Sequence, residues 1–319
     1  MTASNTCRTT ATRARIAAVG AIAVAGSLML TACGDQTSSG SKESTGTSES
    51  SAALFSKLPK KYQDSKVIKV GTDAAYAPME FEEGGKIVGV DPDIAAALGK
   101  ELGVTLQFTN GTFDGLISSL NTGRQDLVMS AMSDTKARQQ GLDDKGKKVG
   151  EGVDFVDYFT SGVSLLVKKG NPEKIQSFDD LCGKKVAVQR GTIYETTFKT
   201  QATKCSADGK GKLTIEAFDT DAEAQTRVKS GGAVADLNDY PVSAYIAKTA
   251  GGGNDFEVAG DQTDAGPFGI AVDKDNAQLR DALKEAVAAI IKNGEYNKVL
   301  EKWDVKNSAV TEATINAGK

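Results

Sequence analysis

Four short segments of the 319-residue chain place polar side chains directly after runs of β-branched and apolar residues, where strands are expected to end. The segments are "TDAAYAPM", "SAMSDTKAR", "QRGTIYE" and "NDYPVSAY". Arg138 can hold a carboxylate through two parallel hydrogen bonds, and Ser133 and the backbone N–H groups near Thr135 and Thr192 can add donors. Asp239 can accept from an ammonium group. Together these groups suit the two charged ends of a zwitterion.

Each of these residues also has a purely structural interpretation. Arg138 is equally explained as an arginine on an exposed helix face, and Asp239, followed by Tyr and Pro, as an ordinary helix N-cap. Tyr76 and Phe113 can stack on a ligand, although single aromatic residues of this kind more often belong to a core. Spacing along the sequence leaves both interpretations open.

The composition argues against several other chemistries. The chain has no histidine, which excludes nucleophilic triads that use an imidazole base. It also lacks the glycine-rich patterns of nucleotide-binding loops, and no two acids are placed for a carboxylate-only catalyst. We therefore expect no catalytic residue, no cofactor and no metal site.

Strands and helices that position these segments alternate along the chain. The runs "VIKVGTD", "VTLQF" and "DLVMSAM" predict strands, and "FDGLISSLNTG" predicts a helix between the second and the third. A further helix is expected at 92–102, with Asp91 as its N-cap and Gly103 as its stop. This order predicts parallel βαβ units covered by helices.

A second series of the same kind begins at "VSLLVKK". It continues through the strands "KKVAVQ" and "LTIEAF", a helix from Thr192, a helix in "DAEAQTRVKSGG" and the strand-like "AVADLN". Helices at about 276–293 and 295–303 close the chain. Ligands of open α/β sheets bind beyond the carboxyl ends of the strands, so the four polar segments are where a binding site is expected.

The N-terminal region has the composition of an export signal. Residues 1–15 carry three arginines and no acid, residues 16–29 are small and apolar, and "LTAC" follows at 30–33. The apolar stretch is shorter than the roughly 20 residues of a membrane-spanning helix. The block at 30–33 resembles the processing site of bacterial lipoproteins, in which the cysteine, here Cys33, becomes the first mature residue and is acylated on sulfur. An ordinary signal peptide with a chance cysteine is the alternative.

The sequence after Cys33, "GDQTSSGSKESTGTSESSAA", is rich in Ser, Thr and Gly and predicts a flexible tether. Cleavage before Cys33 would remove three of the 38 basic residues and none of the 42 acidic ones. The resulting excess of negative charge argues against a nucleic-acid partner.

Two cysteines are left for the folded part of the chain. Of the four, Cys7 would leave with the signal and Cys33 would be acylated, so Cys182 and Cys205 remain. In an oxidising compartment these two are expected to form a disulfide, which would stabilise the fold by about 3 kcal/mol. Metal binding by two cysteines without histidine is the alternative.

Several stretches in a fixed order carry a family resemblance. "VGTDAAYAPMEFEEGGKIVGVDPDIAAALGKELGV", "FDGLISSLNTGRQDLVMSAMSDTKARQQ", "VDFVDYFTSGVSLLVKKGNP", "LCGKKVAVQRGT", "NDYPVSAY" and "NGEYNKVLEKW" resemble the family 3 solute-binding proteins of ABC importers, which serve polar amino acids. The resemblance runs from about Val67 to Val305. It implies an α/β, two-lobed, periplasmic-binding-protein-like fold of type II, with mixed sheets flanked by helices and two hinge strands.

The resemblance implies limits for the two lobes, and the composition of the N-terminal region gives the limits of the parts before them. These are a signal peptide at 1–32, a lipidated cysteine and flexible tether at 33–65, lobe 1 at 66–160 plus 266–306, lobe 2 at 163–262, and a C-terminal tail at 307–319.

Roles for the two charged ends of the ligand follow from the same resemblance. Arg138 would bind the ligand α-carboxylate, helped by the backbone N–H groups of Ser133 and Thr192. Asp239 would take the α-ammonium, together with the Ser133 hydroxyl and the Ala131 carbonyl.

The remaining expected ligand contacts concern the ligand side chain. Tyr76 and Phe113 match the aromatic residues that flank the ligand, and Asp73 and Ser130 lie where side-chain selectivity is set. Asp73 would favour a cationic or hydrogen-bonding side chain, whereas Arg190, if it faced the cleft, would favour an acidic one. "GLDDKGKKVGEG" at 141–152 is an insertion relative to the family and is expected to be a surface loop.

The expected function is therefore that of a monomeric receptor held by lipid on the extracytoplasmic face of the cell membrane. It would capture a free polar or charged amino acid and deliver it to an ABC transporter permease. Two alternatives remain, namely an exported enzyme of the cyclohexadienyl dehydratase type on the same fold, and a surface sensor or adhesin that feeds no transporter.

Overall fold

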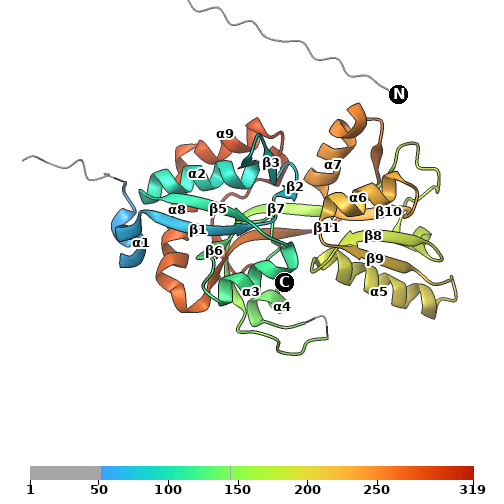
Figure 1. The fold of residues 1–319 in the computed structure, drawn as a ribbon, viewed down its shortest axis with the longest axis horizontal. Helices are drawn as coiled ribbons and strands as arrows, with labels where there is room; N and C mark the ends of the chain where they lie inside the picture. The colour runs from blue at the N-terminus through green and yellow to red at the C-terminus, as the bar shows by residue number, and fades with distance from the viewer. Residues whose placement is uncertain (1–51, 144) are drawn as a thin grey trace, which may run out of the picture. The chain divides into compact units, whose positions relative to one another are not determined.

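The structure is a computed structural model that describes residues 52–143 and 145–319, apart from the side chains of residues 264 and 265 (Figure 1). The predicted signal peptide, Cys33 and most of the predicted tether lie outside the described residues. Within the described part, no helix has the length and apolar character needed to cross a membrane.

One mixed sheet of nine strands forms the centre of the fold. Its order is β5-β1-β6-β11-β7-β10-β8-β9, and β12 pairs with β7 beside this path. The strands are β1 (Val67–Thr72), β5 (Thr105–Asn110), β6 (Leu127–Val128), β7 (Val153–Lys168), β8 (Lys185–Gln189), β9 (Thr214–Phe218), β10 (Ala235–Asp239), β11 (Phe256–Asp273) and β12 (Thr314–Ile315). A second small sheet contains β2 (Ala75–Tyr76), β3 (Glu80–Glu83) and β4 (Lys86–Val88).

Helices cover both faces of the large sheet (Figure 1). The α-helices are α1 (Lys60–Ser65), α2 (Val90–Leu102), α3 (Leu116–Asn121), α4 (Lys136–Gln140), α5 (Ile193–Ala207), α6 (Asp221–Lys229), α7 (Tyr240–Thr249), α8 (Ala277–Asn293) and α9 (Glu295–Lys302). Short 3-10 turns include η2 (Phe113–Gly115) and η3 (Phe178–Leu181).

The buried side chains of the large sheet belong mainly to two large hydrophobic cores. The first contains Ile68 of β1 and Leu98 of α2, together with side chains of α8 and α9. The second contains Val186 and Val188 of β8 with Phe198 of α5, while Ala187 between them faces a smaller cluster under α6. This alternation is the period of two expected for a strand covered on both faces. We use lobe 1 and lobe 2 for the parts of the chain around the first and the second core, and the residue limits predicted for them stay a prediction.

Strands β7 and β11 connect the two lobes as a pair of long antiparallel strands. Tyr158 and Phe159 of β7 belong to the core of lobe 1, and Leu165 and Val167 of the same strand belong to the core of lobe 2. Sequence patterning predicts a separate strand from "VSLLVKK", whereas the structure has one strand that begins ten residues earlier, at Val153. The two-lobed α/β fold with two connecting strands is thus as predicted.

Part of the predicted tether is folded, so the prediction of a flexible segment up to residue 65 is wrong for its last part. Leu58 and Tyr62 are fully or almost fully buried in the core of lobe 1, and Leu54 and Phe55 pack against it. These four apolar residues in "LFSKLPKKY" bury enough surface to order the segment and α1.

The start of α2 also differs from the prediction. The N-cap is Gly89, not Asp91, and its φ of 138° suits glycine. A Cβ at Gly89 would lie 2.2 Å from the carbonyl oxygen of Met79, so no side chain fits there. Asp91 is instead fully buried within the first turn, where its carboxylate has partners far away in the sequence.

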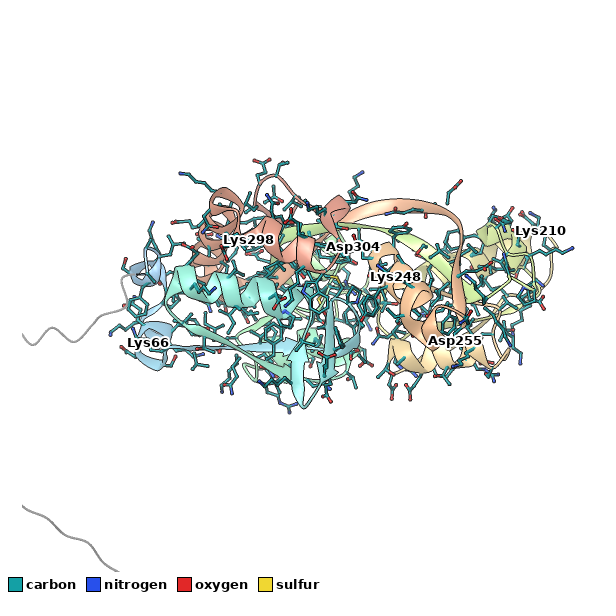
Figure 2. All side chains as sticks on the ribbon, turned by 90° about the horizontal axis from the view of Figure 1, so that it is seen from above. Lys66, Lys210, Lys248, Asp255, Lys298 and Asp304 are labelled. Atoms are coloured by element: carbon teal, nitrogen blue, oxygen red, sulfur yellow. A yellow bond between two sulfur atoms is a disulfide. The ribbon has the colours of Figure 1, made fainter. Side chains whose placement is uncertain are left out.

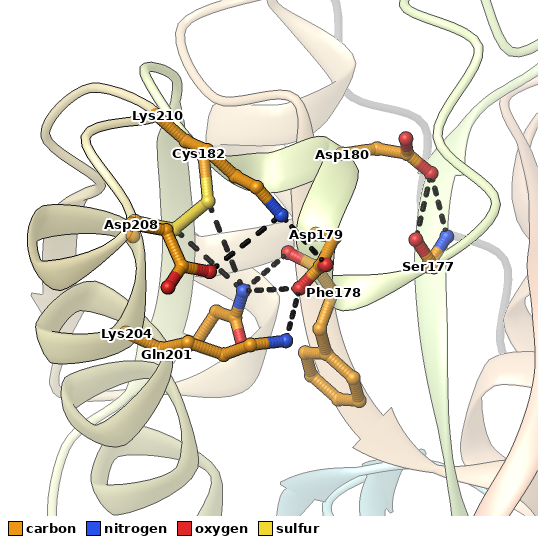
Figure 3. A network of polar contacts seen from close by, with 10 residues as sticks. Ser177, Phe178, Asp179, Asp180, Cys182, Gln201, Lys204, Asp208 and Lys210 are labelled. Atoms are coloured by element: carbon orange, nitrogen blue, oxygen red, sulfur yellow. Dashed lines mark hydrogen bonds and ion pairs between the residues drawn. A yellow bond between two sulfur atoms is a disulfide. The ribbon is translucent and has the colours of Figure 1, made fainter.

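A disulfide joins Cys182, after η3, to Cys205 near the end of α5, with a Cα–Cα distance of 5.4 Å. Figure 3 shows the side-chain amide of Gln201 next to both sulfur atoms and to Asp179. The Lys204 ammonium, 2.6 Å from Asp179, holds the pKa of that carboxyl below its usual range. This network lies at the end of α5 that is opposite to Thr192.

Candidate functional site

A cavity of about 20 Å³ lies where the two lobes meet. Twelve residues line it: Asp73, Tyr76, Glu80, Phe113, Ala131, Ser133, Arg138, Gln189, Thr192, Ile193, Tyr194 and Asp239. Eight of the nine predicted ligand-binding residues are among them, and the ninth, Ser130, lies directly behind. The structure therefore brings the predicted set together, and it adds Glu80, Gln189, Ile193 and Tyr194.

Strand ends position most of these side chains. Asp73 directly follows β1, Ala131 follows β6, Thr192 follows β8, and Asp239 is the last residue of β10. Because β1 and β6 are parallel, as are β8 and β10, their carboxyl ends lie on the same side within each lobe. The ends from the two lobes face each other across the cavity, as expected for ligand sites of open α/β sheets.

The Arg138 guanidinium is half-buried and has hydrogen bonds only to backbone carbonyls. Nη1 donates to Ser133 O at 2.8 Å, and Nη2 donates to Gly191 O at 3.2 Å. The guanidinium carbon lies 5.3 Å from the centre of the Phe113 ring. Burial lowers the pKa of Arg138 to about 10. Among the described residues no carboxylate forms a salt bridge with it, so its fork-shaped donors are available for an anion.

Asp239 lies across the cavity from Arg138, surrounded by hydroxyl groups. Its Oδ2 accepts a 2.7 Å hydrogen bond from Tyr76 OH, and the hydroxyls of Tyr194 and Ser161 lie close to the carboxylate and help to lower its pKa. Burial raises the pKa of Asp239 to about 6. The carboxylate is therefore ionised at neutral pH and accepts only from neutral donors, an arrangement that suits an incoming ammonium group.

Asp73 provides a second buried carboxylate in the cavity. It accepts from the side-chain amide of Gln189 and from the backbone N–H groups of Ala75 and Phe113. Burial raises its pKa to about 6. Ser130 orders this corner, because its hydroxyl accepts from the Asp73 N–H at 2.9 Å.

Glu80 is the third acid of the cavity, and it is held in its neutral form. Its Oε1 accepts from Ser130 Oγ at 3.0 Å. The other side of the carboxyl meets Asp91, which already accepts from Ala131 N at 2.9 Å and from Tyr158 OH at 2.6 Å. Burial and the nearby Asp91 charge raise the pKa of Glu80 well above its usual range. Since two buried acids so close together cannot both be ionised, Glu80 keeps its proton and Asp91 carries the negative charge.

The charges of the cavity therefore do not balance within the described residues. Arg138 contributes one positive charge, Asp73 and Asp239 contribute two negative ones, and Glu80 is neutral. A ligand with one anionic and two cationic groups would complement this set. Within the described residues, no group of three or more Cys, Asp or Glu side chains is placed to hold a metal ion.

Contacts between the lobes close over the cavity. Tyr76 of lobe 1 bonds to Asp239 of lobe 2, Gln189 of lobe 2 bonds to Asp73 of lobe 1, and Arg138 reaches the Gly191 carbonyl. These contacts enclose the cavity between the two lobes. An amino acid can therefore enter only if the lobes separate.

An exposed ion pair between the lobes lies outside the cavity. Lys248 of α7 is 3.5 Å from Asp304, which follows α9 (Figure 2). The two side chains are 74% and 90% exposed, so solvent screens the pair and its contribution to closure is small.

Arg190 does not face the cavity. Its guanidinium bonds to Asp219 at 3.3 Å and to the carbonyl of Ala217 at 3.0 Å, both in lobe 2, and its side chain is exposed. The positive charge that would have favoured an acidic ligand side chain is therefore not part of the site, which leaves Asp73 as the charged group at the selectivity position.

Glu80, Gln189 and Tyr194 were not predicted as site residues. The signals for them were present but weak: Gln189 is the last residue of a predicted strand, and Tyr194 lies within the post-strand segment "QRGTIYE". Glu80 follows "TDAAYAPM" by one position, which by itself also suits an exposed strand.

Residues 68–306 match the family described as bacterial extracellular solute-binding proteins, family 3. The chain belongs to this family, and the resemblance seen in the sequence is confirmed. It is thus a solute-binding protein of the class whose members include amino-acid-binding components of ABC transporters.

Individual relatives agree with this assignment. The chain is 29% identical over 261 residues to the arginine-binding protein ArgT of Corynebacterium glutamicum. The aligned region covers 81% of each of the two chains. An ancestral arginine-binding protein solved bound to arginine superposes with a TM-score of 0.66 at 34% identity, covering 75% of this chain and 98% of that one. The ancestral amino acid-binding protein AncCDT-1, a precursor of cyclohexadienyl dehydratase, gives a TM-score of 0.64 at 37% identity, covering 76% and 97%.

Proposed function

We propose that this chain is a lipid-anchored extracytoplasmic receptor that binds a free amino acid with a cationic side chain and delivers it to an ABC permease. The observation that carries the choice of ligand is the charge balance of the cavity. One unpaired guanidinium, that of Arg138, faces two ionised carboxylates, those of Asp73 and Asp239. Arginine, lysine and ornithine each have one carboxylate and two cationic groups.

The ligand α-carboxylate binds Arg138. It replaces the carbonyl contacts of the guanidinium with charge-assisted hydrogen bonds, each contributing about 1.5–3 kcal/mol. The backbone N–H of Ser133 and the backbone at the start of α5, next to Thr192, add donors from both lobes. Phe113 covers one side of the guanidinium and limits its contact with water.

The two cationic groups of the ligand bind the two carboxylates. The α-ammonium binds Asp239, where it displaces or shares the hydroxyl of Tyr76, and the side-chain cation binds Asp73 beside Gln189. With one charged pair at each of three points, a binding free energy of about 8 kcal/mol, equivalent to micromolar affinity, is within reach.

Binding is coupled to closure because the ligand contacts come from both lobes. Arg138 and Asp73 belong to lobe 1, and Asp239 and Thr192 belong to lobe 2. A ligand that touches all four stabilises the closed arrangement more than the open one, which shifts the population toward closure. The closed form is then the one that a permease recognises.

The relatives support this ligand class. ArgT is named as an arginine-binding protein, and the ancestral arginine-binding protein with a TM-score of 0.66 was solved with arginine. The proposal of a lipid anchor rests on the "LTAC" block alone.

Replacing Cys33 by alanine tests this anchor. The replacement should move the mature protein from the membrane fraction to the soluble fraction, and a variant that stays in the membrane fraction would contradict the anchor.

A thermal-shift screen of residues 52–319 with the twenty amino acids and ornithine tests the ligand class. L-Arginine at a hundred times its dissociation constant should add about 2.7 kcal/mol of stability. The shift should vanish in Arg138→Ala, since the α-carboxylate loses its partner. Arg190→Ala is the matched control, because that arginine follows Gln189 of the cavity directly but bonds to Asp219 and Ala217 outside it, and it should keep the shift.

The opposite result has a definite meaning. If no cationic amino acid raises the melting temperature, the ligand assignment is wrong. If the melting temperature of Arg138→Ala rises with L-arginine as much as that of the wild type, the proposed contact between Arg138 and the ligand α-carboxylate is wrong even though the ligand class is right.

A dehydratase is the second candidate, because AncCDT-1 is a precursor of that enzyme and because Glu80 places a protonated acid in the cavity. Such an acid can protonate a leaving hydroxyl. Turnover of a cyclohexadienyl acid that is lost in Glu80→Gln would favour the enzyme, whereas a binding protein should show no turnover in either form.

A further inference from the structure

The last seven residues, Ala313–Lys319, fold back onto lobe 1, and we refer to them as the C-terminal strap. They lie beyond residues 68–306, which carry the family match. The strap begins with β12, where Thr314 pairs with Asp157 and Ile315 with Val156 of β7. Part of the "tail" expected from the sequence thus belongs to the large sheet, and the C-terminus lies beside α4 (Figure 1).

Asn316 fixes the strap next to β12. Its side-chain amide donates to Asp154 at 2.9 Å, its Oδ1 accepts from Phe155 N at 2.8 Å, and its own N–H donates to Phe155 O at 3.1 Å. Three hydrogen bonds to two adjacent residues of β7 leave the strap little freedom at this point.

The end of the strap contacts the segment that contains Ser133 and Arg138, the two residues proposed to bind the ligand carboxylate. Gly318 N donates to Asp134 Oδ2 at 2.7 Å, and Lys319 O accepts from Lys136 N at 3.1 Å. Lys136 is the first residue of α4, so its N–H has no partner within the helix. The strap therefore contacts the chain on both sides of Thr135, two and four residues before Arg138.

The opposite side of the same segment rests on β11. Asp134 N donates to Pro267 O at 2.9 Å, Gly269 N donates to Met132 O at 3.0 Å, and Ser133 forms a bridge with Phe268. The segment 132–136 is thus held between β11 on one side and the strap on the other. The position of this segment therefore depends on two parts of the chain, β11 and the strap, that are far from it in the sequence.

Two buried acids make the strap contacts necessary. Asp134 and Asp157 are 3% and 1% exposed, and their carboxyls interact with each other. The strap supplies Ala317 N at 3.1 Å and Thr314 Oγ1 at 3.0 Å to Asp157, in addition to Gly318 N to Asp134. Burial raises the pKa of Asp157 to about 6. Without the strap these oxygens would lose most of their donors, which is costly in a buried position.

We propose that the C-terminal strap is a positioning element of the binding site, which holds Ser133 and Arg138 in place for the ligand carboxylate. This inference rests on the proposed function. A five-residue helix such as α4 has few hydrogen bonds of its own, so its position depends on what its ends contact. The strap touches no ligand and acts only through Asp134 and the first turn of α4.

Gly318 offers a test with one added methyl group. A Cβ there would lie 2.1 Å from the carbonyl oxygen of Asp134, so Gly318→Ala must push the strap away from the segment. Gly150→Ala is the matched control, because its Cβ would meet nothing closer than 3.6 Å. Lys319→Ala is a second control, since only the backbone carbonyl of Lys319 contacts α4.

The measurement is the dissociation constant of L-arginine by calorimetry, together with the melting temperature without ligand. Gly318→Ala should weaken binding about tenfold, because two side chains of the site lose their preorganisation. Gly150→Ala and Lys319→Ala should stay within about twofold of the wild type. A folded Gly318→Ala that binds L-arginine as tightly as the wild type overturns the proposal.

Hydrogen exchange of the ligand-free protein separates this proposal from the proposed function. The N–H groups of Asp134 and Lys136 should exchange at least tenfold faster in Gly318→Ala, whichever ligand the protein binds. If Gly318→Ala does not fold, a chain ending at Ile315 takes its place in both measurements. Unchanged exchange at these positions overturns the proposal, whereas a wild type that ignores L-arginine overturns only the ligand assignment.

Discussion

Replacing Gly191 by alanine tests whether the two lobes must touch for a ligand to bind. Gly191 follows β8 in lobe 2 with a φ of 75°. A Cβ at this position would lie 2.7 Å from the Cβ and 3.0 Å from the Cα of Asp114, which belongs to η2 in lobe 1. The added methyl therefore meets the backbone of the opposite lobe, which cannot rotate away as a flexible side chain can.

Two separate costs follow from this geometry. The left-handed backbone disfavours alanine by about 1–2 kcal/mol, and this cost is the same whether the lobes are open or closed. The clash exists only when they are closed, because carbon atoms normally stay about 3.5–4.0 Å apart and the gap is short by about 1 Å. Overpacking of this size costs about 1–3 kcal/mol, so the dissociation constant should rise about 5- to 150-fold.

Calorimetric titration with L-arginine and thermal unfolding without ligand measure the two costs independently. Gly231→Ala is the matched control, because Gly231 is also in lobe 2, has a φ of 78° and would place its Cβ within 4 Å of nothing. Both variants should lose similar stability. Only Gly191→Ala should lose affinity.

The reasoning would be refuted if both variants bound L-arginine as tightly as the wild type. It would mean that L-arginine binds without the contact between Gly191 and Asp114, and that the closed arrangement is not the binding-competent one. A loss of affinity in both would instead show that strain in lobe 2 alone disturbs the site.

Three further predictions concern buried groups. Because burial raises the pKa of Asp239 to about 6, the folded state takes up this proton at a higher pH than the unfolded state does. Lowering the pH from 7.5 to 5.5 should therefore raise the melting temperature of the ligand-free protein, yet weaken L-arginine binding about fourfold in calorimetry, because only the ionised carboxylate binds the ammonium. Glu80→Gln should change the unfolding free energy by less than about 1 kcal/mol, because Glu80 is neutral. Asp91→Asn should lower it by about 2 kcal/mol or more, because Asp91 is ionised. Equal losses of unfolding free energy for the two variants in denaturant titrations would contradict this protonation state. Replacing Cys182 and Cys205 by serine should lower the unfolding free energy by about 3 kcal/mol and leave L-arginine affinity unchanged, so a weaker dissociation constant would indicate coupling along α5.

The site residues that could be predicted are those that act from the end of a strand. Ser133, Thr192 and Asp239 come at or after the ends of segments that the sequence predicts as strands, and Arg138 lies in the polar segment that follows one of them. Tyr194 could not be found in this way, because it reaches Asp239 only through the packing of α5 against its sheet. The same holds for the neutral state of Glu80, which depends on its contact with another acid in three dimensions.

Helices with strong local signals were predicted closely, as α8 and α9 show. Both flank Gly294, which has a φ of 85° and interrupts the helical pattern. Asp91 misled the prediction because its type and position suit an N-cap, whereas its partners Ala131 and Tyr158 lie 40 and 67 residues further along the chain. Long-range partners of this kind leave no local pattern to read.

Residues outside the family match were predicted least well. Leu58 before the matched region and the C-terminal strap after it were expected to be parts of a tether and a tail. Each is instead packed on lobe 1, Leu58 in its core and the strap on β7. The reason is that short segments gain order from the surface they cover, which their own composition does not reveal.

The continuity of β7 and β11 has a thermodynamic consequence for a molecule with two cores. Each strand carries residues of both, and the pair keeps its ladder from Val153 to Lys168, apart from register shifts between Ala259 and Gly266 and next to Gly269. If either core melted, half of each long strand would lose its packing while still joined to the other half. The two lobes should therefore unfold in a single transition, and heat capacity should show one peak where the architecture alone would suggest two.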